Sequence, residues 1–230
     1  MQEGYSGGSF EASYARLGAR LERKTRGWRC DSDMRGVNSE HLQEGGLRVD
    51  SHEVGEARIK EMTAGVAKYM RGERELYFRH SEALTAEWKA AIGGYFHQEL
   101  LGNIRTVILQ GARIPPPPFY TEAKKLSGGR FPDFVHMASI TYLDVIVFHD
   151  EIKQRTLFHG LVHAAQMAFL GFERYVDLYV RGFAKNRSWL AIALEDQAYK
   201  LDARFANDPT RVFSVENEIK LWAEEGRFDS

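Results

Sequence analysis

Two histidines, His159 and His163, stand four residues apart in the apolar stretch RTLFHGLVHAAQMAFLGF. On an α-helix this spacing puts both imidazoles on one face, one turn apart, so that both can point at one ion. Zinc hydrolases use the same spacing in the motif H-E-x-x-H, where the glutamate is the general base. This chain reads H-G-L-V-H, with Gly160 at the position of the glutamate. The pair is consistent with a metal site, and equally with two ordinary histidines of a core helix.

A metal site needs a third ligand, and Glu195 is the strongest acidic candidate downstream of the pair. It follows the apolar run AIAL, so we expect its carboxylate to face inward. A buried carboxylate needs a partner, which a metal ion would supply. Glu173 and Asp177 are expected on the outward, polar side of their helix. The alternative for Glu195 is a helix N-terminal carboxylate that interacts with free backbone N–H groups.

Periodicity and turn residues predict the elements that position these side chains. Strands are expected at 103–111 and 136–150, separated by the stiff proline loop 113–120. Helices are expected at 56–72, 81–96, 121–129, 151–171, 172–186, 189–208 and 214–226, with Ser81 and Ser214 as N-caps and Gly171 as a stop. This order predicts an α+β fold, in which a small β-sheet packs against several helices and the C-terminal half is helix-rich.

Composition divides the chain into two parts. Residues 1–55 are rich in glycine, serine and charge, and only 10–24 show helical spacing, so we predict a loosely ordered N-terminal arm. Residues 56–230 are predicted to form a single domain, because their number suits one hydrophobic core.

Charge and hydropathy exclude several classes of partner. The formal net charge is −1 and basic residues are interspersed with acidic ones, which argues against nucleic-acid binding. No apolar run approaches the roughly 20 residues that span a bilayer, and the first residues do not resemble a signal peptide. The single cysteine, Cys30, has no partner for an internal disulfide. We therefore expect a cytoplasmic protein, and nothing in the sequence sets its oligomeric state.

The order of several short motifs resembles a group of bacterial zincin-like domains of largely uncharacterised function. The resemblance runs from about residue 95 to 206 and rests on YFHQELLGNIRTVIL, PPPFY, PDFVHMASITYLDVIV, LFHGLVHAAQ, LGFERYVDLYVRGF and LEDQAYKLDARF. In the wider gluzincin group, two helix histidines and a glutamate on a later helix bind zinc. The resemblance therefore implies a zincin-like fold in which His159, His163 and Glu195 bind Zn²⁺.

Gly160 is the position at which this chain departs from those proteins. Losing a general base typically costs roughly 10²–10⁴-fold in rate, whereas zinc binding does not need that side chain. His149 and Asp150 are candidate substitutes, because they follow the strand that borders the cleft in zincins. Tyr199, one turn after Glu195, could hydrogen-bond a ligand or an oxyanion. A strand-end turn for the first two and a core tyrosine for the third are the competing interpretations.

Four functions remain open at this point. The first is zinc-assisted hydrolysis of a peptide or another small amide. The second is a catalytically inactive pseudoenzyme that serves as a binding or interaction module, which Gly160 favours. The third follows because two histidines and one carboxylate also form the facial triad of non-haem iron proteins, so that Fe²⁺ is the alternative metal. The fourth is a helical domain without a metal.

Overall fold

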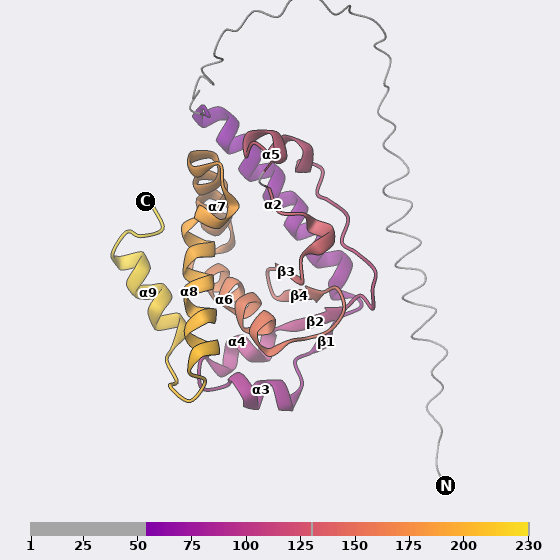
Figure 1. The fold of residues 1–230 in the computed structure, drawn as a ribbon, viewed down its shortest axis with the longest axis vertical. Coiled ribbons are helices and arrows are strands. Elements are labelled where there is room, and N and C mark those ends of the chain that lie inside the picture. Colours follow the sequence, from indigo (N-terminus) through magenta and orange to yellow (C-terminus); the bar gives the residue numbers. More distant parts are fainter. Residues whose placement is uncertain (1–53, 130, 230) are drawn as a thin grey trace, which may run out of the picture. The chain divides into compact units, whose positions relative to one another are not determined.

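The computed structural model describes residues 54–129 and 131–229, which form an α+β fold as predicted (Figure 1). The arm predicted for residues 1–55, with its helix at 10–24, lies outside the described residues except for Val54 and Gly55. The α-helices are α2 (Glu56–Phe78), α3 (Ala86–Ile92), α4 (Gln98–Asn103), α5 (Tyr120–Leu126), α6 (Gln154–Leu170), α7 (Phe172–Asn186), α8 (Ala193–Asn207) and α9 (Val215–Glu224). The strands are β1 (Glu82–Ala83), β2 (Arg105–Ile108), β3 (Ser139–Tyr142) and β4 (Val145–Phe148), and short 3₁₀ helices occupy Phe134–His136 and Trp189–Ala191.

The sheet has the strand order β1-β2-β4-β3. Its central pair, β2 and β4, is parallel, while β1 and β3 are antiparallel to their neighbours. All four residues of β4, Val145–Phe148, are buried, as expected for an apolar strand that is covered on both faces. The strand β3 is therefore an edge of the sheet, and it lies beside α6.

The single strand predicted for 136–150 is wrong, because this segment is the hairpin β3–β4. The chain reverses at Leu143, which has a φ of 59°. Tight turns of this kind favour glycine or asparagine, and the absence of either left the turn without a signal in the sequence. The next residue, Asp144, accepts two hydrogen bonds of 2.8 Å from the Arg74 guanidinium group of α2, which holds the turn in place.

The helix predicted for 81–96 also begins in the wrong place. Ser81 is not an N-cap: its hydroxyl group donates to the carbonyl oxygen of Phe78 at the end of α2, and β1 follows. The N-cap is Thr85, whose side chain accepts a hydrogen bond from the Trp88 amide. By contrast, Ser214 caps α9 as predicted, through the amide of Asn217.

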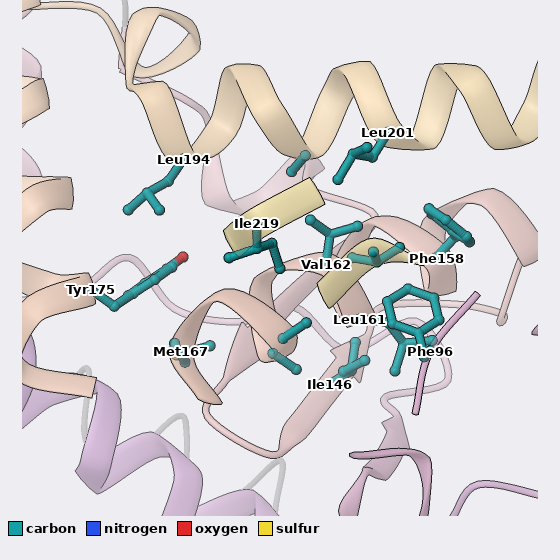
Figure 2. Packing of buried hydrophobic residues seen from close by; sticks show 14 of the residues in the cluster. Phe96, Ile146, Phe158, Leu161, Val162, Met167, Tyr175, Leu194, Leu201 and Ile219 are labelled. Atoms are coloured by element: carbon teal, nitrogen blue, oxygen red, sulfur yellow. The ribbon is translucent and has the colours of Figure 1, made fainter. Parts of the chain in front are cut away.

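The helix α6 is the centre of the fold. All but one of its residues from Leu157 to Met167 are buried, because it packs against the sheet, α7, α8 and α9. Figure 2 shows residues of this core from several elements: Phe96, Ile146, Phe158, Leu161, Val162, Leu194, Leu201 and Ile219. The helix ends before Gly171, which has a φ of 81°, so the predicted stop is confirmed. Among the described residues, no helix combines the length and the apolar character that crossing a membrane requires.

The helices α2 and α7 pack against each other in opposite directions. Arg71 of α2 pairs with Glu173 at the start of α7, and Arg181 near the end of α7 pairs with Glu56 at the start of α2. These four side chains are exposed, so charge lies on the outside of this helix pair.

Candidate metal centre

The structure brings His159, His163 and Glu195 together into one cluster, which we call the metal triad. The Nε2 atoms of the two histidines are 3.0 Å apart, and Glu195 Oε2 lies 3.7 Å from the first and 3.5 Å from the second. A point about 2 Å from all three atoms lies near the centre of this triangle, and about 2.0–2.1 Å is the usual length of a bond from zinc to these atoms. The spacing therefore fits one zinc ion with three protein ligands.

Asp202 fixes the orientation and the tautomer of His159. Its Oδ2 atom lies 3.0 Å from His159 Nδ1, and its Oδ1 atom accepts a hydrogen bond of 2.8 Å from Arg155. A carboxylate oxygen accepts the hydrogen bond in this contact, so Nδ1 of His159 is the donor and carries a proton. In neutral His159, the Nε2 atom then presents its lone pair to the centre of the triad.

Gln166 fixes the orientation and the tautomer of His163 through its side-chain amide. Its Nε2 atom donates to the carbonyl oxygen of Leu194 at 2.9 Å and to Gln197 at 3.0 Å, which fixes the direction of the amide. The Gln166 oxygen therefore faces His163 Nδ1, at 3.0 Å, and accepts a hydrogen bond from its N–H group. The Nε2 atom of neutral His163 is then also a lone pair that faces the centre of the triad.

Glu195 contributes the third ligand atom from the first turn of α8. Its Oε1 atom accepts a hydrogen bond of 2.9 Å from Tyr179, whose oxygen in turn accepts one from the indole of Trp189. Its Oε2 atom is buried and has no hydrogen-bond partner among the described residues. Two nitrogen lone pairs and an unpartnered carboxylate oxygen thus converge on one point, an arrangement that repels itself unless a cation binds there. This donor set fits a divalent metal ion.

Protonation is the alternative way to balance the charge of Glu195. Burial opposes the charged form of His159, but Asp202 and Glu195 outweigh it and raise the pKa of His159 to about 9. Burial likewise opposes ionisation of Glu195, yet His163 and His159 outweigh it and lower its pKa to about 2. A proton on His159 therefore takes the place of the metal ion when no metal is bound, and the two compete for the same lone pair.

A cavity of about 670 Å³ opens beside the metal triad. The triad, Tyr199 and Arg155 line one part of it. The remainder is lined mainly by apolar side chains from α2, α7, β3 and the segment 131–138. We use the name apolar wall for the six residues that α2 and α7 contribute at helical spacing: Met62, Val66, Tyr69, Val176, Val180 and Phe183.

Gly160 lies where α6 packs most closely against the sheet. A Cβ atom at this position would be 3.0 Å from the Thr141 hydroxyl oxygen and 3.0 Å from a methyl group of Ile146. The Thr141 hydroxyl group also donates a 3.1 Å hydrogen bond to the Gly160 carbonyl oxygen. Close packing thus gives a physical reason for glycine here, since a Cβ atom requires the side chains of Thr141 and Ile146 to give way by a few tenths of an ångström.

Of the three candidate catalytic residues, only Tyr199 lines the cavity. Its ring centroid lies 4.7 Å from that of His159. The buried His149 side chain instead accepts a weak hydrogen bond of 3.4 Å from the Ile114 amide, and the exposed Asp150 pairs with Arg113 at 3.1 Å. Neither lines the cavity, so the structure does not bring His149 or Asp150 to the metal triad.

Four residues that orient the ligands were not predicted from the sequence: Arg155, Gln166, Tyr179 and Asp202. Two spacings carried a signal. Gln166 lies three residues after His163, and Asp202 lies seven after Glu195, so each shares a helix face with a ligand. Tyr179 carried no comparable signal, because it comes from a different helix.

No family model, no curated protein and no solved structure matches this chain. The geometry of the site is therefore the basis on which a function is proposed.

Proposed function

We propose that this protein binds one Zn²⁺ ion through His159, His163 and Glu195, in a zincin-like arrangement, and uses the ion to hold an oxygen-bearing ligand in the adjacent cavity. The observation that carries the proposal is the convergence of two Nε2 lone pairs and the unpartnered Glu195 oxygen on one point. Two helix histidines, a glutamate from a later helix and an edge strand beside the cavity agree with the resemblance to gluzincins. Three protein ligands leave a fourth position for water or a ligand.

The carboxylates of the cavity favour binding over efficient peptide hydrolysis. Four of them line it: Glu61, Glu122, Glu195 and Asp202. Glu195 is a ligand and Asp202 holds His159, while Glu61 and Glu122 both pair with Arg58. Within the described part of the cavity, no carboxylate is therefore free to act as the general base that position 160 lacks.

Slow, zinc-assisted amide hydrolysis is a second candidate, which Tyr199 favours. Burial raises the pKa of its hydroxyl group to about 12, so it stays protonated and can donate a hydrogen bond to an oxyanion. If this function holds, Tyr199→Phe abolishes amide hydrolysis of the zinc-loaded chain and leaves zinc affinity unchanged.

Metal analysis of the full chain tests the main proposal. The protein is purified without added metal, then stripped with a chelator and titrated with Zn²⁺ and, under nitrogen, with Fe²⁺. We expect one equivalent of zinc and a higher affinity for zinc than for Fe²⁺. One equivalent of tightly bound iron instead would support the non-haem iron alternative, and no binding of either ion would overturn the proposal.

A further inference from the structure

The cavity beside the metal triad has two chemically different ends. On α7, Tyr175 and Tyr179 contact His163 and Glu195, whereas Phe183 packs against Phe131 with ring centroids 5.2 Å apart. Eight residues separate Tyr175 from Phe183, which is about 12 Å along a helix. The apolar wall thus leads away from the metal triad.

The helix α2 shows the same change from polar contacts near the metal triad to apolar residues further away. Tyr69 bonds to Tyr142 of β3, next to the strand residue that touches Gly160, so this part of α2 lies near the metal end. Met62 and Arg58 follow in the opposite direction, about 10 and 16 Å further along the helix. Arg58 pairs there with two carboxylates, Glu61 and Glu122, so the three side chains together carry a net charge of −1. Among the described residues that line it, the far end therefore offers no unpaired cation to a carboxylate, and the metal end is the part that recognises a polar group.

From this arrangement we infer that the cavity binds a long-chain aliphatic molecule, whose carboxylate or amide carbonyl oxygen ligates the metal ion while its chain lies along the apolar wall. The position of the head group rests on the proposed function, but the apolar wall does not. A volume of about 670 Å³ falls in the range of pockets that enclose small-molecule ligands. Each methylene group buried against such a wall strengthens binding about four-fold.

An extended peptide is the competing occupant, because β3 is an edge strand whose residues Ser139–Tyr142 line the cavity. Burying a peptide main chain requires a hydrogen-bond partner for each N–H and C=O group. The apolar wall offers only one polar side-chain group, the Tyr69 hydroxyl, and this is already paired with Tyr142. The wall therefore favours the aliphatic chain.

The test uses the zinc-loaded full chain and four probes: octanoate, laurate, lauramide and an unacylated peptide amide of mixed sequence. Calorimetry measures affinity, and the visible spectrum of the Co²⁺-substituted protein reports whether an oxygen atom ligates the metal. We expect laurate to bind about 100-fold or more tightly than octanoate, and to change the cobalt spectrum. Comparing the affinities of lauramide and laurate shows whether the cavity prefers an acyl amide or a free acid. Equal affinities of octanoate and laurate, or tighter binding of the peptide, would overturn the inference.

Two glycines of α2 provide a matched pair of variants. Gly65 lines the cavity and is exposed, so it lies at the opening, and a Cβ atom there meets nothing within 4 Å. Gly72 has equally free surroundings on the same helix but does not line the cavity. Gly65→Trp should weaken laurate binding at least ten-fold, while Gly72→Trp should leave it unchanged and both should bind zinc like the parent. An equal effect of the two substitutions on laurate would contradict the assignment of the cavity.

Failure of this inference and failure of the proposed function give different results. If the chain binds one equivalent of zinc but neither laurate nor lauramide, the inference fails and the metal site stands. If laurate binds equally well with and without zinc and leaves the cobalt spectrum unchanged, the ion does not hold the head group. If laurate binds and no metal does, the proposed function fails and only the apolar part of the inference survives.

Discussion

The contact between α6 and α8 and the contact between α2 and α7 present different side chains to the cavity, polar in the first case and apolar in the second. Where α6 and α8 face the cavity, the contact holds a polar cluster of two histidines, a glutamate, an aspartate and two glutamines, and hydrogen bonds join His159 to Asp202 and His163 to the glutamines. Between α2 and α7 the inner side is apolar and the ion pairs lie outside. Both contacts line the same cavity.

This difference assigns separate tasks to the two contacts. Burying a polar cluster costs free energy unless every group is partnered, and a divalent ion would partner the three groups at the centre of this cluster. Burying apolar side chains stabilises a fold directly. We therefore expect substitutions between α6 and α8 to change metal affinity, and substitutions between α2 and α7 to change stability and the binding of apolar ligands.

The largest effect is expected from His163→Ala. Removing one of three ligands should weaken zinc binding by more than about 100-fold, which is the upper end of what outer partners of a ligand contribute. Competition with a chelator of known zinc affinity measures this loss. His136→Ala is the control, since His136 is exposed and does not line the cavity. Equal zinc affinities of the two variants would remove the metal triad as the binding site.

The opposite behaviour is expected from Phe183→Ala in the apolar wall. Phe183 is 5% exposed and packs on Phe131, so its truncation should lower the free energy of unfolding by about 3 kcal/mol. Urea denaturation measures this change. The affinity for zinc should stay at the level of the parent, and a large loss of zinc affinity would show that the two contacts are not independent.

The helices and strands can be predicted from the sequence to a greater extent than the surroundings of the metal triad. The helices α6 and α7 follow from apolar spacing and from Gly171, and the spacing of His159 and His163 follows from the helix itself. The hairpin at Leu143 was missed because its turn lacks the usual residue. Tyr179 was missed for a different reason: it reaches Glu195 only because α7 packs against α8, which no local pattern encodes, whereas Gln166 and Asp202 share a helix face with a ligand.

Asp202→Asn tests whether the partners of the ligands matter for the metal. Without the Asp202 charge that faces Nδ1, the imidazole of His159 is less basic and binds zinc less tightly through Nε2. We therefore expect zinc affinity to fall about ten- to 100-fold. Asp196→Asn on the same helix is the matched control, because Asp196 pairs with Lys200 and does not line the cavity. Comparable zinc affinities in both variants would restrict the function of Asp202 to its pairing with Arg155.

The response to pH separates the zinc-free from the zinc-bound protein. Because the pKa of His159 is raised from 6.5 to about 9, its ion pair stabilises the zinc-free fold fully below pH 6.5 and is lost as the pH rises through 9. Glu195, with a pKa lowered to about 2, stays ionised throughout this window. Zinc instead binds better as protons leave. Thermal unfolding with and without zinc should therefore show a stabilisation by zinc that grows from pH 6.5 to 9, and a constant difference would contradict the competition between proton and metal.

The smallest effect is expected at Gly160, where α6 packs against the sheet. Gly160→Ala should gain about 1 kcal/mol of helix propensity but lose about 1–3 kcal/mol to crowding against Thr141 and Ile146. We expect a net loss of about 1 kcal/mol in the free energy of unfolding. The double variant Gly160→Ala/Ile146→Val should recover part of the crowding term, because it removes the Ile146 Cδ1 methyl group, which lies 3.2 Å from the position of the new Cβ atom. A stabilised Gly160→Ala protein would mean that the sheet yields to a side chain, and Gly160→Glu could then be tested for a gain of amide hydrolysis. With the expected loss, close packing rather than the absence of a reaction accounts for the glycine in this motif.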